Sequence, residues 1–312
     1  MAGIPLITGA TGFAGSHLLD LLISEHDVVH AWFNPEGRTP RREDARIRWR
    51  AVGLLDRAAV DAAFEDASPS IVYHCAGIAD VQQSWRAPAR ALEVNVLGTH
   101  HLLEAASRSG FRGRVLVTGS ALVYRPSSTA LTEGDALGPI GPYAVSKLAQ
   151  EMAAARSTVD VLLTRPFNHA GPRQDDSYVT SAFARQIANI ERGIGEPVLR
   201  VGNLDARRDI TDVRDVVRAY KDLGDRGVPR TPYNVCRGEA YRVGDLLDVL
   251  LSLANVGVEV RTDPSRMRPS DNPVVLGSHE RLTRDTGWTP AIPIERTLAD
   301  ILDYWRANAS AA

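Results

Sequence analysis

Short apolar runs alternate with segments of helical periodicity through the first half of the chain. In residues 15–24 the apolar side chains fall on one helical side, and a longer helical pattern covers 89–107. Apolar runs of strand length cover residues 4–8, 28–33, 71–76, 114–118 and 161–164. Strands separated by helices are typical of βαβ units, in which a parallel sheet carries helices on both faces.

The pattern changes after residue 165. Gly, Pro, Asp and Arg are dense between residues 168 and 212, which predicts a ligand-facing region of loops and one helix over 181–192. Helical patterns return at 246–253 and 294–305. The second half of the chain is therefore expected to form a smaller part that is rich in helix.

Composition narrows the class of protein. The 312 residues carry a net charge of −2, so no basic field suggests nucleic acid as a partner. Cys75 and Cys236 are isolated from each other, which predicts no disulfide framework, no metal site and a reducing cytoplasm. No apolar stretch approaches the roughly 18 residues that span a bilayer, so no membrane partner is expected.

A glycine-rich loop connects the first predicted strand to the first predicted helix. Residues 8–15 read TGATGFAG, with the spacing G-x-x-G-x-x-G. Glycines here permit a tight turn and close approach of backbone to a pyrophosphate, which the helix N-terminus favours. The loop therefore predicts dinucleotide binding, although its glycines are also typical of a simple turn with positive φ.

The end of the second predicted strand bears on the choice of cofactor. An acid there usually binds the adenosine ribose of NAD, but this strand ends at Asn34, and Arg38, Arg41 and Arg42 follow. An arginine accommodates a 2′-phosphate that a carboxylate would repel. The chain is expected to use NADP, or NAD as well, unless these arginines only face solvent.

Tyr143 and Lys147 lie four residues apart in a segment that opens a helix after Pro142, so both project from one face. A nearby ammonium lowers the pKa of a phenol from about 10 and makes it a usable acid. Ser120 follows the strand at 114–118, at the strand end where open α/β sheets bind substrates. These three residues are the candidate catalytic group, with Ser120 placed to bond a substrate oxygen.

These motifs resemble the extended short-chain dehydrogenase/reductases of the nucleotide-sugar epimerase, dehydratase and reductase superfamily. The glycine loop, HCAG at 74–77, NVLGT at 95–99, SALVY at 120–124, the Tyr143/Lys147 pair and RPFN at 165–168 occur in that family's order. The resemblance implies that Tyr143 is the acid/base and that Lys147 lowers its pKa and holds the nicotinamide ribose. It implies a cofactor site formed by Gly9, Thr11, Gly12, Phe13, Ala14, Asn34, Arg38, Leu54, Ala76, Gly77, Asn95, Tyr143, Lys147 and Pro166.

The fold class that follows is α/β: a Rossmann-type doubly wound parallel sheet with a smaller, interleaved α/β substrate-binding domain. The dinucleotide-binding domain is expected to comprise residues 1–166 with a return segment near 209–235. The substrate-binding domain is expected to comprise 167–208 and 236–312. The resemblance also implies a homodimer formed by helices near 89–107 and 143–156.

Two later segments, 201–209 and 266–271, are similar to GDP-mannose dehydratases and GDP-4-keto-6-deoxymannose reductases. That similarity implies that Arg208, Arg268 and Asn168 bind the diphosphate, work suited to a guanidinium fork, and that Asp271 binds a ribose hydroxyl. The substrate site it implies is Ser120, Asn168, Val179, Arg185, Asn203, Arg208, Arg268 and Asp271. One departure is Arg173, which stands where a glycine is usual.

The residues after Ser120 indicate the reaction. A dehydratase of this family carries an acid there to move a proton, whereas this chain has Ala121 and Leu122. We therefore expect NAD(P)H-dependent reduction of a 4-keto group, most simply GDP-4-keto-6-deoxy-D-mannose to GDP-D-rhamnose. The alternatives are a 4-epimerase with tightly bound NAD and, with less support, a GDP-mannose 4,6-dehydratase or a non-catalytic dinucleotide-binding regulator. The cofactor, the base, the sugar and the C4 stereochemistry remain open at this level.

Overall fold

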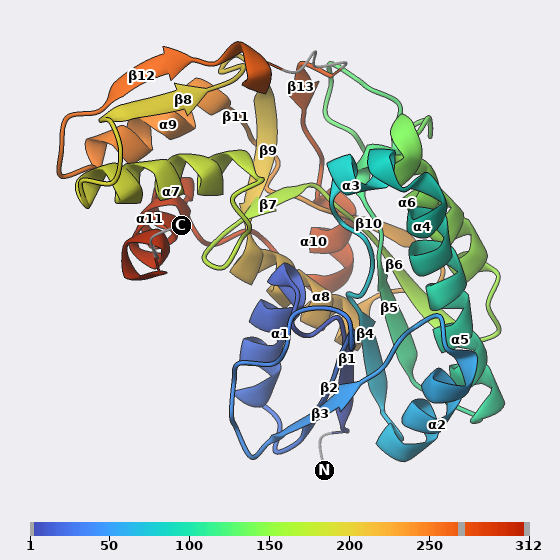
Figure 1. The fold of residues 1–312 in the computed structure, drawn as a ribbon. Helices are drawn as coiled ribbons and strands as arrows, with labels where there is room; N and C mark the ends of the chain where they lie inside the picture. The colour runs from blue at the N-terminus through green and yellow to red at the C-terminus, as the bar shows by residue number, and fades with distance from the viewer. Residues whose placement is uncertain (1–2, 268–271, 309–312) are drawn as a thin grey trace.

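The structure is a computed structural model that describes residues 3–267 and 272–308. It contains two lobes, a larger one around a parallel sheet and a smaller one that includes the C-terminal helix (Figure 1). Among the described residues, no helix is both long and apolar enough to cross a membrane. Nor does this part of the chain hold a cluster of three His, Cys, Asp or Glu side chains suited to a metal.

The larger lobe is built on seven parallel strands in the order β10-β6-β5-β4-β1-β2-β3. This order confirms the predicted doubly wound α/β sheet, and the strand predicted at 114–118 is confirmed at its bounds. The strands are β1 (Pro5–Thr8), β2 (Val29–Phe33), β3 (Ile47–Ala51), β4 (Ile71–His74), β5 (Arg114–Thr118), β6 (Asp160–Pro166) and β10 (Pro232–Val235).

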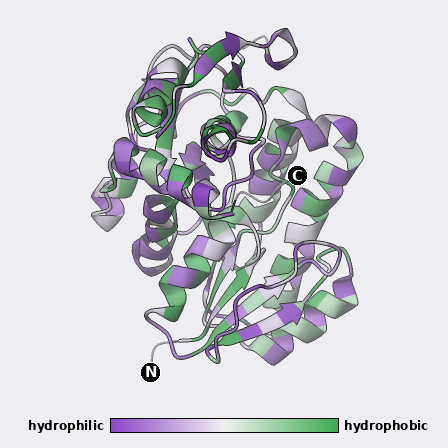
Figure 2. Cartoon of the chain, turned by 60° about the vertical axis from the view of Figure 1, so that its left-hand side comes forward, coloured by the Kyte–Doolittle hydropathy of each residue, from purple (hydrophilic) through white to green (hydrophobic). Residues whose placement is uncertain are grey.

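Helices bury both faces of this sheet, which explains why its strands are nearly continuous apolar runs. Within β1, Leu6 belongs to the cluster on one face and Ile7 to the cluster on the other. Hydrophobic positions accordingly concentrate in the central strands (Figure 2). One face carries α1 (Phe13–Ile23), α8 (Val213–Arg226) and α10 (Glu280–Thr286); the other carries α2 (Arg57–Ala67), α5 (Gly98–Arg108) and α6 (Gly141–Ala155).

The helical pattern at 89–107 is interrupted in the structure. It consists of α4 (Pro88–Leu92), a π-helical turn Glu93–Leu97 and α5, preceded by the short α3 (Val81–Arg86). Such π-helical turns in helices are frequent at functional sites. The sequence pattern did not predict strand β3 or helix α2.

The smaller lobe contains more strand than the sequence predicted. The region 168–212 was expected to hold loops and one helix, and the helix is present as α7 (Val179–Glu191). Three strands accompany it, so the expectation of loops was wrong there. They are β7 (Asn168–Ala170), β8 (Val198–Val201) and β9 (Arg207–Asp212).

These strands are completed by later parts of the chain. β9 pairs with β7, β11 (Ala240–Arg242) and β13 (Val274–Val275), and β8 pairs with β12 (Glu259–Thr262). α7 packs with α9 (Val243–Ser252) and α11 (Ile294–Asn308) around a third apolar cluster. The division into residues 1–166 with 209–235, and 167–208 with 236–312, stays a prediction.

Candidate active site

The glycine loop joins β1 to α1 at the carboxyl edge of the large sheet. Gly9 has a φ of +70°, and a Cβ there would lie 2.7 Å from the Ala76 backbone. A Cβ on Gly15 would lie 2.2 Å from the carbonyl oxygen of Gly9. Among the described contacts no side chain caps α1, so its first N–H groups face the loop. This cradle fits the pyrophosphate of a dinucleotide.

The loop after β2 presents Asn34 and Arg38 to solvent. Arg38 Nη2 donates to Asp175 Oδ2 at 3.2 Å, and both side chains are largely exposed. Arg42 forms an ion pair with Asp20. Because exposed ion pairs are weak, a phosphate can compete with Asp175 for the Arg38 guanidinium.

Tyr143 projects from the first turn of α6 towards Ser120, the residue that follows β5 by two positions. The Ser120 hydroxyl also accepts a backbone N–H of the short turn Ala121–Val123, so it combines a turn role with a site position. Burial raises the pKa of Tyr143 to about 12, against the lowering effect of its hydrogen bond with Ser120. The phenol therefore keeps its proton near neutrality and can donate it. An effect of Lys147 on this pKa stays a prediction.

Lys147 is buried, one turn further along α6. Its Nζ donates to the Thr118 carbonyl oxygen at 2.8 Å and to Gln150 Oε1 at 3.0 Å. Burial lowers the pKa of Lys147 to about 8, with a small opposing effect of Cys75. Burial and the Lys147 charge lower the pKa of His74 to about 3, so this imidazole is neutral.

Asn95 lies in the π-helical turn Glu93–Leu97 and is fully buried. Its Oδ1 accepts from Ile78 N at 2.8 Å, and its Nδ2 donates to Ser146 Oγ at 2.9 Å. A Cβ on Gly77 would lie 2.7 Å from Asn95 Oδ1, so the chain requires glycine there. Asn95 thus fixes the loop after β4 that carries the predicted cofactor residues Ala76 and Gly77.

The remaining predicted cofactor residues also lie on this edge of the sheet. Leu54 follows β3, and its carbonyl accepts from His101 Nδ1 at 2.9 Å. Pro166 is the last residue of β6. Phe13 stacks on His169 of β7 with ring centroids 5.6 Å apart. Thr11 and Gly12 lie in the glycine turn and Ala14 in the first turn of α1.

The turn after Ser120 presents apolar side chains, because Ala121 is buried and Leu122 is 41% exposed. Two carboxylates from neighbouring segments are engaged elsewhere. Glu151 accepts from buried Arg165 at 2.6 and 2.9 Å, and Glu133 accepts a backbone N–H at 2.9 Å. The described geometry therefore supplies a phenolic proton donor without a carboxylate base beside it.

Apart from Ser120, the predicted substrate residues that the structure describes lie on β7, α7 and β9 and in the turn before β9. Asn168 is exposed on β7, and Val179 opens α7. Arg185 forms an ion pair with Asp176 and lies over the Trp305 ring at 5.6 Å. Because β7 follows β6 almost directly, Asn168 lies beside the carboxyl edge of the large sheet, whereas Val179 and Arg185 lie along α7.

Two predicted residues lie in or beside β9. Asn203 Oδ1 accepts the backbone N–H of Asp205 at 2.9 Å. Arg208 Nη1 donates to the Arg207 carbonyl at 2.8 Å, and burial lowers the pKa of Arg208. Arg268 and Asp271, the other predicted diphosphate and ribose ligands, lie outside the described residues.

Arg173 stands where a glycine is usual in the family, and its contacts show how the chain accommodates an arginine there. Its φ is +73°, the left-handed region in which glycine is favoured. Its guanidinium donates to Asp20 at 2.6 Å and lies 2.7 Å from His17 Nδ1. These side-chain contacts therefore stabilise a left-handed backbone conformation that a non-glycine residue rarely adopts.

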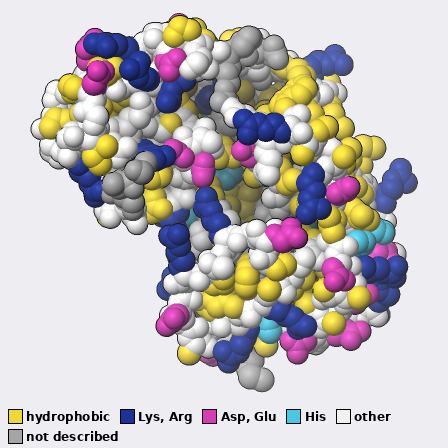
Figure 3. Space-filling view, viewed as in Figure 1, with side chains coloured by type: hydrophobic (Ala, Val, Ile, Leu, Met, Phe, Trp, Pro, Cys, Tyr) yellow, Lys and Arg dark blue, Asp and Glu magenta, His cyan; other side chains and the backbone are white. Residues whose placement is uncertain are grey.

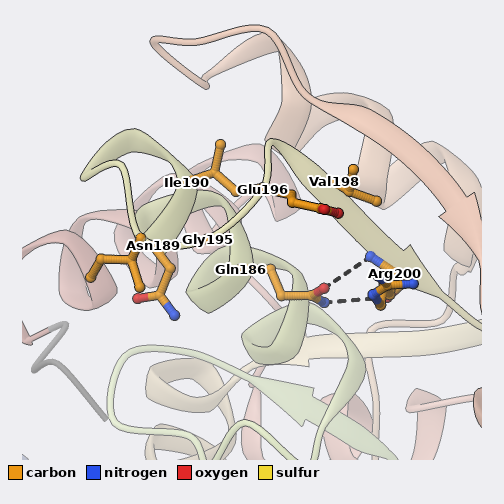
Figure 4. A pocket seen from close by; sticks show the side chains of 8 residues that line it. Gln186, Asn189, Ile190, Gly195, Glu196, Val198 and Arg200 are labelled. Atoms are coloured by element: carbon orange, nitrogen blue, oxygen red, sulfur yellow. Dashed lines mark hydrogen bonds between the residues drawn. The ribbon is translucent and has the colours of Figure 1, made fainter.

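Sequence reasoning missed Gln150, Thr99 and His74, which surround Lys147. His74 and Thr99 belong to the HCAG and NVLGT motifs, and Gln150 lies three residues after Lys147 on the same helix, but none of them was assigned to the site. A hollow of about 400 Å³ between α7 and β8 was also not anticipated. Figure 4 shows Gln186 in it, where Oε1 accepts from Arg200 N at 2.9 Å and Nε2 donates to Arg200 O at 3.3 Å.

A tyrosine and a lysine one turn apart at the carboxyl edge of a doubly wound sheet are typical of short-chain dehydrogenase/reductases. The sequence profile of the GDP-mannose 4,6 dehydratase family matches residues 6–301. The chain belongs to this family of NAD(P)-dependent nucleotide-sugar enzymes, which confirms the resemblance seen in the sequence.

Relatives of known activity or known structure are similar to this protein over nearly the whole chain. A GDP-6-deoxy-D-mannose reductase of Pseudomonas aeruginosa is 38% identical over 309 residues, 97% of each chain. RMD from Pseudomonas aeruginosa, solved in complex with NADPH, is 35% identical with a TM-score of 0.86, covering 98% of this chain and 99% of that one. The Thermus thermophilus UDP-glucose 4-epimerase complex with NAD is 26% identical with a TM-score of 0.86, covering 98% and 99%.

Proposed function

We propose that the protein reduces the 4-keto group of a nucleotide-activated 6-deoxyhexose, converting GDP-4-keto-6-deoxy-D-mannose to GDP-D-rhamnose. The observation that carries this proposal is the protonated phenol of Tyr143, bonded to Ser120 and followed by the apolar turn at Ala121 and Leu122. Reduction of a ketone needs one proton for the oxygen, which this phenol supplies. Elimination of water needs a base as well. The likeness to a GDP-6-deoxy-D-mannose reductase supports the same choice.

We assign the cofactor site to the cradle of Gly9, Gly12 and Gly15 and to the loop at Ala76 and Gly77. The rigid glycine turn and the uncapped α1 fit a pyrophosphate, and Arg38 favours NADPH over NADH. A reduced nicotinamide, when bound, supplies the hydride for C4. The NADPH and NAD complexes of the structural relatives support a nicotinamide dinucleotide.

Tyr143, Ser120 and Lys147 have different roles in the proposed reduction. Tyr143 gives its proton to the C4 oxygen as that oxygen gains negative charge, and the product is a hydroxyl. Ser120 donates a hydrogen bond to the same oxygen and orients it. The Lys147 ammonium stabilises the phenolate that remains until solvent restores its proton.

Arg208, Arg185 and Asn168 are assigned to the nucleotide end of the substrate. Guanidinium groups bind diphosphate through paired N–H donors, and Arg208 already uses donors on backbone carbonyls that a phosphate can replace. With Val179 and Asn203, they form our proposed GDP site.

The decisive experiment follows NADPH absorbance when purified protein meets GDP-4-keto-6-deoxy-D-mannose. Consumption of one NADPH per sugar, with GDP-rhamnose as product, is expected. A parallel thermal-shift screen compares GDP, UDP, dTDP and CDP sugars. Stabilisation by UDP-sugars alone, with NAD⁺ released on denaturation, would instead indicate a 4-epimerase.

We also propose a homodimer. Leu92, Leu97, Val145 and Met152 are all more than 40% exposed on α4, the π-helical turn and α6. Hydrophobic side chains gather over these helices on the right of Figure 3, and exposed patches of this kind mark interfaces. Leu97→Glu is expected to convert the dimer to a monomer in light scattering. An unchanged mass would exclude this face.

The free thiols Cys75 and Cys236 support a reducing compartment, and we propose the cytoplasm. Cell fractionation with an antibody against the chain tests this location.

A further inference from the structure

A chain of buried hydrogen bonds runs from the strand before the glycine loop to Lys147. Thr8 Oγ1 lies 2.7 Å from His74 Nδ1, and His74 Nε2 lies 2.8 Å from Thr99 Oγ1. Gln150 Nε2 donates to Thr99 Oγ1 at 2.8 Å, and Gln150 Oε1 accepts from Lys147 Nζ at 3.0 Å. All five side chains are buried. They come from β1, β4, α5 and α6, so these hydrogen bonds connect two neighbouring strands to the helices on one face of the sheet.

The donors and acceptors in this chain have only one consistent arrangement. Lys147 cannot accept a hydrogen bond, so the oxygen of Gln150 must face it and the amide nitrogen must face Thr99. The single Thr99 hydroxyl proton goes to the Asn95 carbonyl, 2.6 Å away. Thr99 therefore accepts from Gln150, and it also accepts from His74, which must carry its proton on Nε2.

The proton position on His74 also determines the hydrogen bond of Thr8, the residue before the glycine loop. Because Nε2 of His74 holds the proton, Nδ1 accepts, and Thr8 is the donor. Thr8 Oγ1 in turn accepts the backbone N–H of Ala76 at 3.3 Å. His74 is neutral, so it can keep this tautomer without a second ring proton. None of these hydrogen-bonded side chains can rotate without breaking a buried hydrogen bond.

We propose that Gln150 is a positioning residue that aims the Lys147 ammonium and sets its proton affinity. Thr99, His74 and Thr8 hold Gln150 in place from behind. Lys147 has a second acceptor in the Thr118 carbonyl, and these two bonds direct the remaining N–H towards the site. This proposal rests on the proposed role of Lys147 but not on the identity of the sugar.

Packing alone does not account for Gln150. A buried amide costs free energy unless every polar atom is bonded, whereas a leucine of similar size carries no such requirement. The Glu151 carboxylate on the next residue is bonded to Arg165 and is not the acceptor of Lys147. The titratable groups that interact with Lys147 are His74, the last residue of β4, and Cys75, which follows it; Tyr143 lies one turn earlier on α6. Gln150 thus supplies a neutral side-chain acceptor to Lys147 among ionisable neighbours, beside the backbone carbonyl of Thr118.

The experiment measures the titration of Lys147 directly. The sequence contains two lysines, Lys147 and Lys221, so ¹³C-labelled lysine gives two side-chain signals. Lys221 forms a surface ion pair with Glu25 that raises its pKa, and Lys221→Arg assigns the signals. The titration uses the protein without cofactor or substrate, so it is independent of the reductase assay.

Gln150→Leu removes an acceptor from the ammonium and is expected to lower the Lys147 pKa by about one unit, a tenfold change in proton affinity. Gln150→Glu keeps an acceptor, adds a negative charge and is expected to raise the pKa by a similar amount. Thr99→Val frees Gln150 and is expected to give a smaller decrease. Opposite shifts from two substitutions of one side chain are not produced by loosened packing.

Gln186→Leu is the matched control, since it also removes the side-chain hydrogen bonds of a helical glutamine, here to Ala182 and Arg200, and leaves the Lys147 surroundings intact. It is expected to lower the melting temperature without moving the Lys147 titration. Equal Lys147 titrations in the wild type and in the folded Gln150 variants would overturn the proposal. If Gln150→Leu does not fold, the Glu variant decides. A shifted titration in a protein that reduces no 4-keto sugar would leave this proposal standing and remove the proposed function.

Discussion

The surroundings of Lys147 in the larger lobe and the predicted substrate residues of the smaller lobe differ in how completely their polar groups are bonded before any ligand arrives. Around Lys147 the side chains are buried and tied to one another, with Gln150, Thr99 and His74 behind the ammonium. On the smaller lobe Asn168 is exposed, and Arg185 is half-exposed and forms an ion pair with Asp176. The chemistry is therefore preorganised, whereas nucleotide recognition uses groups that can still move.

This difference predicts which kinetic parameter a substitution changes on each side. A change on the preorganised side should lower kcat, because the affected interactions matter most in the transition state. A change on the smaller lobe should raise KM, because those interactions hold substrate and transition state alike. Four predictions test this division, from the largest effect to the smallest.

Tyr143→Phe removes the proton donor and is expected to lower kcat by roughly 10³-fold, within the range for lost general acid catalysis. NADPH fluorescence titration should give an affinity within about twofold of wild type, since the ring and Lys147 remain. Stopped-flow or steady-state loss of NADPH absorbance measures the rate. Retention of a tenth of the wild-type rate would show that another group donates the proton.

Arg208→Ala removes a guanidinium from the proposed diphosphate site and is expected to raise KM for the GDP-sugar by roughly 30-fold with little change in kcat, the effect of one lost charged hydrogen-bonding group. Arg208→Lys should be intermediate, because an ammonium keeps the charge but not the paired donors. Calorimetric titration with GDP checks the affinity. A fall in kcat alone would place Arg208 with the preorganised side instead.

Alkaline pH should deprotonate Lys147 before Tyr143, since burial lowers the pKa of Lys147 to about 8 and raises that of Tyr143 to about 12. The ammonium is present below its pKa and lost as pH rises, so the rate of reduction is expected to fall through one limb near pH 8. At pH 9 roughly one tenth of the rate should remain for a single titration. A pH profile at saturating NADPH measures this. A flat profile to pH 10 contradicts the role of the charge.

Arg38→Ala is expected to raise KM for NADPH by roughly fivefold, the effect of one exposed charged contact, and to leave KM for NADH unchanged. Asp175→Asn is the companion variant, because it frees Arg38 from its ion pair and should tighten NADPH slightly. Initial rates with both cofactors provide the comparison. Equal losses with NADPH and NADH would show that Arg38 does not contact a 2′-phosphate.

Local patterns in the sequence determined much of this protein. The strand, glycine turn and helix at residues 5–23, and the spacing of Tyr143 and Lys147, depend on neighbours within a few residues, so they could be read directly. The family and the doubly wound sheet followed and are confirmed. The site residues stay predictions.

Tertiary structure decided the rest. The strands of the smaller lobe were missed because β9 pairs with β7, β11 and β13 from distant parts of the chain. The groups that hold Lys147 were missed for the same reason, since Thr99 lies 51 residues from Gln150 and 25 from His74. Periodicity reports burial and local conformation, but a buried hydrogen bond exists only once folding brings its donor and acceptor together.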